Sequence, residues 1–162
     1  MILIALGSNR NGPWGNPHET VTRAVAELDR DGLRLVSASR LLVSLPFGKT
    51  NQPPFVNAVA RISTHLPPQA LMQKLHAIER SAGRRRMLRW GPRTLDLDLL
   101  DYHGLVSRKP QRLVLPHPGI AERIFVLKPL GEIAPRWKHP LLHASAAVLL
   151  RKLDPHGEGS EI

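Results

Sequence analysis

The chain has no cysteine among its 162 residues, which excludes disulfides and any metal site built from thiolates. It also has no run of about 18 apolar residues, so no membrane-spanning helix is expected. Its amino terminus has neither a basic leader nor an apolar stretch long enough for a signal peptide, and we expect a cytoplasmic protein. The length predicts one domain over residues 1–153, followed by a disordered tail over 154–162.

Acidic and aromatic residues are scarce as well. There are 13 Asp and Glu against 23 Lys and Arg, a formal net charge of +10, and aromatic residues make up 4%. Such a basic balance indicates polyanionic partners, namely nucleic acid, anionic lipid or phosphate-bearing small molecules. The low aromatic content argues against the stacking surfaces of single-strand nucleic-acid binders. Charge alone does not decide among these partners.

Hydrophobic periodicity predicts alternating strands and helices. Strands are expected at 2–6, 33–44, 55–64 and 94–102, and helices at 18–28 and 68–82; residues 7–9 are expected to form a turn. Short strands at 105–106 and 113–115 and helices at 121–130 and 141–153 follow. The order strand, helix, strand, strand, helix, strand is typical of a ferredoxin-like (split βαβ) α+β fold, with an antiparallel sheet flanked by helices.

The most informative segment contains two carboxylates one residue apart, Asp96 and Asp98. Side chains alternate along a strand, so both acids point to one face about 6.6 Å apart, while the leucines between and beside them enter the core. Adjacent carboxylates repel each other and favour a cation nearby, and oxygen ligands favour Mg²⁺. An ordinary solvated strand face is the alternative explanation of the pair.

Five arginines precede the acids within one loop, at positions 84, 85, 86, 89 and 93. Arginine binds phosphate oxygens in bidentate fashion and stays charged. An arginine-rich loop beside paired carboxylates therefore favours phosphoryl transfer from a nucleotide. A nucleic-acid-binding patch is the alternative, although such a surface has little use for paired acids.

These residues resemble a known family. The pattern Arg89-x-Gly-Pro-Arg93-x-x-Asp96-x-Asp98 resembles the signature of the 6-hydroxymethyl-7,8-dihydropterin pyrophosphokinases. Further segments resemble that family in order, covering roughly residues 2–153: 6–9, 52–58, 78–86, 116–118, 123–127 and 129–135. The resemblance implies a monomeric enzyme of folate synthesis that transfers pyrophosphate from ATP to the pterin hydroxymethyl group, with AMP as the other product.

The resemblance also implies site residues. Two Mg²⁺ ions would be held by Asp96 and Asp98, which with Arg84 and Arg93 form the catalytic set. The ATP site would comprise Glu79, Arg86, Trp90, Arg93, Leu99, Arg112, His117 and Arg123. The pterin site would comprise Ser44, Leu45, Phe47, Phe55, Asn57 and Phe125. Neither nucleic acid nor a membrane is an expected partner.

The sequence departs from the family pattern at a few positions. Phe55 replaces a frequent tyrosine, Ser44-Leu45 replaces a frequent Thr-Pro or Thr-Glu pair, and Val114 replaces a common threonine. None of these changes removes the metal-binding acids or the main arginines. Two other functions stay open at this point: a non-catalytic nucleic-acid-binding module, and an enzyme acting on another hydroxymethyl heterocycle.

Overall fold

The computed structural model describes residues 1–44, 53–83, 94–109 and 113–157, and its main sheet has five strands. These are β1 (Ile2–Ser8), β2 (Leu33–Ala38), β3 (Leu42–Ser44), β4 (Phe55–Thr64) and β5 (Asp96–Tyr102). The order is β2-β4-β1-β5, and β3 also pairs with β4. Each of these pairings is antiparallel. A separate antiparallel pair joins β6 (Ser107–Lys109) to β7 (Leu113–Leu115).

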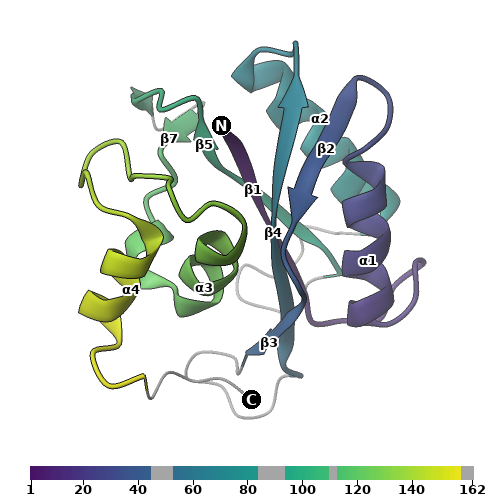
Figure 1. Cartoon of the computed structure of the whole chain (residues 1–162). Coiled ribbons are helices and arrows are strands. Elements are labelled where there is room, and N and C mark those ends of the chain that lie inside the picture. The colour runs from purple at the N-terminus through teal and green to yellow at the C-terminus, as the bar shows by residue number, and fades with distance from the viewer. Residues whose placement is uncertain (45–52, 84–93, 110–112, 158–162) are drawn as a thin grey trace.

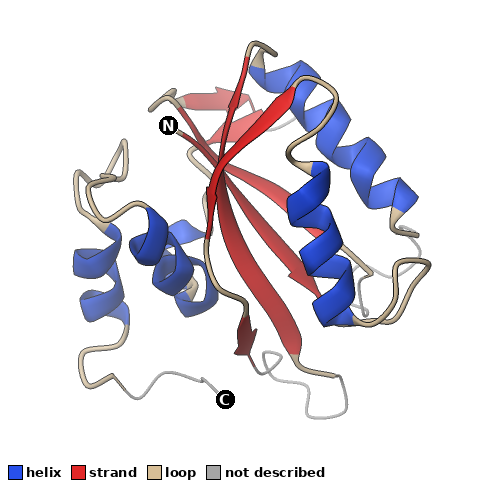
Figure 2. Cartoon of the chain, turned by 45° about the vertical axis from the view of Figure 1, so that its right-hand side comes forward, coloured by secondary structure: helices blue, strands red, loops and turns tan. Residues whose placement is uncertain are grey.

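Helices cover both faces of the main sheet, as Figures 1 and 2 show. One face packs against α1 (Pro17–Glu27) and α2 (Pro68–Ser81), the other against α3 (Ile124–Ile133) and α4 (Ala146–Leu153), with the 3-10 helix η1 (Ile120–Glu122) before α3. Side chains alternate between the two faces along the central strand β1, so this strand contributes to both cores. Ile4 and Leu6 pack under α1 and α2, whereas Leu3 packs under α3 and α4. Among the described residues, no helix is long and apolar enough to cross a membrane.

The ends of two helices are set by local side chains. At the start of α1, Asn16 Oδ1 accepts from the Glu19 N–H at 2.9 Å, and Glu19 Oε1 accepts from the Asn16 N–H at 3.1 Å. This capping box satisfies donors that lack a partner within the helix. At the start of α4, Ser145 Oγ accepts from the Val148 N–H at 3.2 Å. These side chains therefore mark where α1 and α4 begin.

The prediction of one continuous strand over residues 33–44 is wrong, because the structure has two strands there, β2 and β3. Ser39 explains the break. Its Oγ accepts from the Val59 N–H at 2.9 Å and donates to the Arg40 carbonyl at 2.9 Å, so a side chain takes over one bond of the ladder. The chain then leaves β4 and rejoins it at β3.

Other boundaries also differ from the sequence expectation. β1 runs through Gly7 to Ser8 instead of turning at residue 7. β6 occupies 107–109 instead of 105–106, and α3 begins at Ile124 because residues 120–122 form the 3-10 helix. α4 begins at Ala146, since the backbone of residues 138–145 is closed by a bridge between Lys138 and Ser145. β4 and β7 match the predicted ranges.

Candidate functional site

The sheet face toward α3 carries two rows of residues that cross three adjacent strands, β4, β1 and β5. Val59 of β4 and Ala5 of β1 belong to the core under α3 and α4, which identifies the face. The strand register aligns Ala5 with Asp98 and Gly7 with Asp96. The two rows, each read from β4 through β1 to β5, are Asn57–Gly7–Asp96 and Val59–Ala5–Asp98. Gly7 thus separates the Asn57 amide from Asp96, and Ala5 separates Val59 from Asp98.

The alternation predicted around the carboxylates is confirmed. Leu97 and Leu99 are buried against the α1 and α2 side, whereas the Asp98 side chain is 45% exposed. Asp96 is partly exposed on the same face. Both carboxylates can therefore reach a ligand on the α3 side of the sheet while the strand that carries them is anchored in the core.

His117 lies next to Asp98, with Nε2 4.0 Å from Asp98 Oδ2. Its backbone N–H donates to the Leu100 carbonyl at 2.9 Å, which fixes the turn against β5, and its Nδ1 accepts from the Gly119 N–H at 2.9 Å. Burial lowers the pKa of His117 from its ordinary value of 6.5, Arg123 lowers it further, and Asp98 opposes the shift without overcoming it. The imidazole is therefore neutral at pH 7, with its proton on Nε2, and its contact with Asp98 is not an ion pair.

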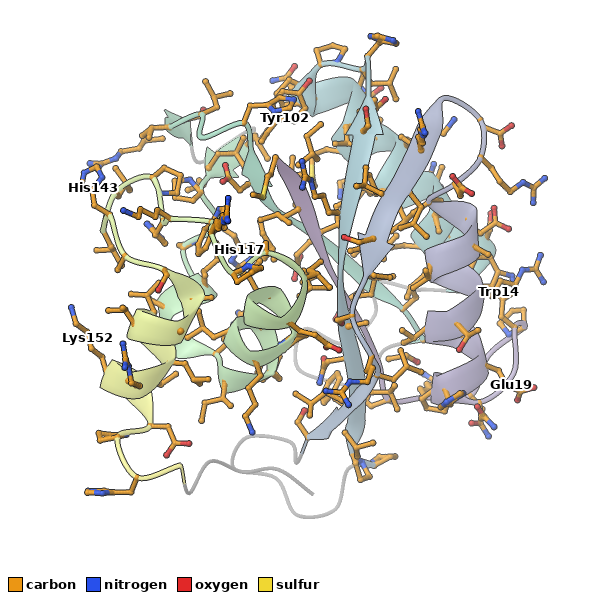
Figure 3. All side chains as sticks on the ribbon, viewed as in Figure 1. Trp14, Glu19, Tyr102, His117, His143 and Lys152 are labelled. Atoms are coloured by element: carbon orange, nitrogen blue, oxygen red, sulfur yellow. The ribbon has the colours of Figure 1, made fainter. Side chains whose placement is uncertain are left out.

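Arg123 adds a positive charge to this corner of the site. Its guanidinium lies 5.9 Å from the centroid of the Phe125 ring, within the range of a cation–π contact. It also lies over Gly119, where an added Cβ would stand 2.8 Å from the guanidinium carbon. Figure 3 shows His117 on the α3 side of the sheet, whereas Trp14 and Glu19 lie with α1 on the other side.

The pterin-side candidates on β3 and β4 are also brought together. Asn57 Nδ2 donates to Ser44 Oγ at 2.7 Å, and the two residues are 5% and 6% exposed. Phe55 is aligned with Ser44 in the strand register and is half-buried. Phe125 is partly buried at the start of α3, a helix that packs against both β3 and β4. β4 thus supplies an amide and one aromatic ring, α3 supplies a second ring, and β3 supplies the Ser44 hydroxyl.

Two predicted nucleotide-site residues lie elsewhere than on this face. The Leu99 side chain is 3% exposed in the core under α1 and α2. Glu79 is 3% exposed, and its Oε2 accepts from the Leu97 N–H at 2.8 Å, which joins α2 to β5. Glu79 therefore connects α2 to β5 through a hydrogen bond that the sequence alone does not predict. The remaining predicted site residues, Leu45, Phe47, Arg84, Arg86, Trp90, Arg93 and Arg112, lie outside the described residues.

Gly7 lies in the row between Asn57 and Asp96, whereas the sequence analysis placed it in a turn and not among the candidate site residues. A Cβ at this position would stand 3.0 Å from Asn57 Oδ1. A side chain at residue 7 would therefore require the Asn57 amide to shift by a few tenths of an ångström. The signal was present in the sequence as a glycine directly after an apolar strand run.

Comparison with known proteins identifies relatives of this chain. The sequence model of the 7,8-dihydro-6-hydroxymethylpterin-pyrophosphokinase (HPPK) family matches residues 3–135. A Pseudomonas aeruginosa 2-amino-4-hydroxy-6-hydroxymethyldihydropteridine pyrophosphokinase is 44% identical over 140 residues, covering 86% of this chain and 83% of that protein. A Methylorubrum extorquens protein of the same description is 44% identical over 157 residues, covering 95% and 94%.

Solved structures agree at the level of the fold. A crystal structure described as HPPK-DHPS in complex with substrates superposes with a TM-score of 0.70 at 13% identity. The match covers 93% of this chain, which spans 43% of that longer chain. At this identity the likeness shows that the two share a fold.

Proposed function

Because this chain belongs to the 7,8-dihydro-6-hydroxymethylpterin-pyrophosphokinase family and transfers pyrophosphate from ATP to hydroxymethyldihydropterin in folate synthesis, we propose that Asp96 and Asp98 bind Mg²⁺ at its reaction centre. The donor set fits this ion, since Mg²⁺ takes one or two carboxylates and completes its shell with water and phosphate oxygens. Among the described residues, no cluster of three or more candidate ligands gathers. Two bound Mg²⁺ ions would neutralise charge on the phosphate oxygens of ATP.

The pterin would lie across the row of Asn57 and Gly7, with its hydroxymethyl group toward Asp96. Two strand spacings separate the ends of this row, about 10 Å, which suits a bicyclic ring and its side arm. Asn57 would hydrogen-bond the ring, and Phe55 and Phe125 would stack on it. Ser44, Leu45 and Phe47 would complete the pocket. The hydroxymethyl oxygen then attacks the β-phosphorus of ATP in line, loses its proton, and displaces AMP.

His117 and Arg123 would bind the phosphates of ATP beside Asp98. The neutral His117 offers its Nε2 proton to a phosphate oxygen, and Arg123 offers a guanidinium that is positioned by Gly119 and Phe125. Glu79 on α2 and Leu99 on β5 would support the nucleotide site from the core beneath it, since both are 3% exposed. Arg84, Arg86, Trp90, Arg93 and Arg112 would supply the remaining contacts, with Arg84 and Arg93 stabilising the departing charge.

Exchange of either carboxylate tests the proposal. We expect Asp96→Asn and Asp98→Asn each to reduce AMP release in the presence of ATP, pterin and Mg²⁺ by about 100-fold or more, because an uncharged amide holds the cation poorly. Asp31→Asn is the matched control, since Asp31 lies in a turn with φ 52, a conformation that asparagine tolerates. Turnover near the wild-type rate in both site variants would refute the proposal.

We also propose the fold type, the oligomeric state and the cellular location of the protein. The strand order β2-β4-β1-β5 supports a ferredoxin-like arrangement. A monomer is supported by Asp29, whose Oδ1 accepts from the Leu35 N–H at 2.9 Å and so blocks a donor of the edge strand β2. We propose a cytoplasmic location, where ATP is available, and no nucleic-acid or membrane partner.

A further inference from the structure

Glu79 is a carboxylate that is buried where α2 packs against the sheet. Leu75 and Ile78, which lie beside it on the packed face of the helix, belong to the apolar core, and Glu79 itself is 3% exposed. Removing a carboxylate from water is costly unless hydrogen bonds replace its hydration. Glu79 Oε2 accepts from the Leu97 N–H at 2.8 Å, so this side chain binds the backbone of β5.

The place of β5 in the sheet explains why a side chain can accept from its backbone. β5 stands at one end of the strand order, and among the described residues β1 is its only strand partner in the main sheet. The N–H groups of an edge strand alternate between those that face the neighbouring strand and those that face away from it. A buried donor of the second kind needs another acceptor, and α2 supplies one to Leu97.

The bonded N–H belongs to the peptide unit that joins Asp96 to Leu97, and Asp98 is the next residue. A peptide unit is planar, so fixing the direction of its N–H restricts the backbone on both sides of it. Rotation of this unit would change the direction in which the Asp96 side chain leaves the strand and its spacing from Asp98. Glu79 therefore acts on the two acids from the opposite face of the sheet.

We propose that Glu79 is a positioning residue of the metal site, whose hydrogen bond to the Leu97 N–H holds Asp96 and Asp98 in the arrangement that binds Mg²⁺. This inference rests on the proposed binding of Mg²⁺ by those two carboxylates. Mg²⁺ demands nearly ideal octahedral geometry with short bonds to oxygen, so a small displacement of a ligand weakens binding. Glu79 performs this role as a hydrogen-bond acceptor and not through its charge.

Two substitutions separate the acceptor from the charge. Glu79→Gln removes the charge but keeps an oxygen at the same place along the side chain. Glu79→Asp keeps the charge but is one methylene shorter, so its carboxylate does not reach the Leu97 N–H from the same helix position. Gln73→Ala, at an exposed position of α2, is the matched control.

The experiment measures binding of the α,β-methylene analogue of ATP, in which a carbon replaces the oxygen between the α and β phosphorus atoms, so that AMP is not released. Calorimetry gives its Kd in EDTA and its Kd in Mg²⁺, and the ratio of the first to the second reports what the metal ion adds to nucleotide binding. Glu79→Asp should lower this ratio about tenfold, through weaker binding in Mg²⁺. Glu79→Gln and Gln73→Ala should leave it near the wild-type value.

A merely structural role of Glu79 would weaken binding equally in EDTA and in Mg²⁺, and an unchanged ratio in Glu79→Asp would overturn the inference. An equal loss in Glu79→Gln would overturn it as well, because the charge would then be the feature that matters. If Glu79→Asp does not fold, Glu79→Met supplies a side chain of similar length without the acceptor, and the same ratio is measured.

Asp96→Asn and Asp98→Asn separate this inference from the proposed function. Each should lower the ratio at least as much as Glu79→Asp does, because an amide replaces a metal-binding carboxylate. Wild-type ratios in both would refute the placement of Mg²⁺ itself. A lowered ratio in these two variants beside an unchanged ratio in Glu79→Asp would refute only the role of Glu79.

Discussion

At the scale of single residues, His139 stabilises a loop through its neutral imidazole. Nδ1 accepts from the N–H groups of Leu141 and Leu142, each at 3.1 Å, and the residue is 6% exposed. Burial lowers its pKa below the ordinary 6.5, His143 lowers it further, and Asp101 opposes the shift. Protonation would place a hydrogen on Nδ1 and break both bonds, so acid should destabilise the fold.

The sign of the pH effect follows from linkage. Because the folded pKa of His139 lies below 6.5, the unfolded chain binds more protons in the window below pH 6.5. The free energy of unfolding should therefore fall as the pH is lowered through that window, by at most about 1.4 kcal/mol per pH unit for each such histidine. His117 is shifted in the same direction and adds to the effect.

Urea titrations at a series of pH values would measure this slope. His139→Asn keeps an oxygen that can accept from the backbone N–H groups two and three residues ahead, but has no titrating group. Below pH 6.5 we expect its free energy of unfolding to fall less steeply with decreasing pH than that of the wild type, by at most about 1.4 kcal/mol per pH unit. Equal slopes for the two proteins would show that His139 does not carry the effect.

The sequence predicted the orientation of single side chains correctly where they alternate along a regular strand. The alternation of acids and leucines around Asp96 and Asp98 predicted which side chains enter the core, because strand side chains must alternate. It failed for Gly7 and for the bond between Ser44 and Asn57. Those features depend on which strands become neighbours, and a single sequence does not state the register.

At the scale of elements, α3 contains Gly131, which limits the stability of the helix. An added Cβ would lie 3.7 Å from the Ala146 Cβ of α4, an ordinary contact distance. Gly131→Ala should therefore raise the free energy of unfolding by about 0.5–1 kcal/mol, because alanine loses less conformational freedom in a helix. A urea midpoint measurement would check this, and AMP release should stay at the wild-type rate.

Gly83 provides the opposing control for that substitution. It has φ +88, and an added Cβ would stand 2.6 Å from the Pro13 ring. Gly83→Ala should thus lower stability by about 1 kcal/mol or more, since the backbone conformation and the space both disfavour a side chain. A loss of stability in Gly131→Ala of the same size would mean that α3 and α4 pack more tightly than the contact distance indicates.

Element prediction from the sequence was accurate for strongly patterned segments and poorer at breaks. β4 and β7 matched their predicted ranges, whereas the division between β2 and β3 was not foreseen. The apolar pattern runs on through residues 33–44, and the break arises because Ser39 bonds the Val59 N–H. A serine in a strand pattern carries no sign of that role until its partner strand is known.

At the scale of the whole molecule, the net charge of +10 should act on the anionic substrate. A basic surface raises the local concentration of ATP, and salt screens this attraction. Between ionic strengths of about 0.01 M and 0.15 M the Debye length falls from about 30 Å to about 8 Å. We expect KM for ATP to rise several-fold over this range, while KM for the uncharged pterin changes by less than about twofold.

Steady-state kinetics at fixed pH and fixed free Mg²⁺ would separate the two constants. Equal changes in both KM values would indicate a general effect of salt on the enzyme instead of an electrostatic effect on the nucleotide. A rise in KM for ATP alone would also give the high net charge a role in attracting the nucleotide. The described part of the site includes only some of the basic residues.

The two-sided packing of the sheet also belongs to this scale. The sequence pattern suggested helices but not their sides, and the structure places α1 and α2 on one face and α3 and α4 on the other. The strand residues that a helix contacts determine which face of the sheet it covers. Leu3 and Val59 point toward α3 because their strands pair in this register. The strand that carries the carboxylates is therefore anchored on both faces, by Leu97 and Leu99 on one side and by Leu100 on the other.

Gly7 has a consequence for resistance to drugs that target this enzyme. A compound resting on the bare backbone of this residue would touch a position where any replacement carries a Cβ into the neighbouring amide oxygen, 3.0 Å away. A substitution at this position could not reshape that surface without also disturbing the amide proposed to recognise the substrate. Inhibitors built to lie flat against this strand should accordingly select escape mutations elsewhere in the pocket.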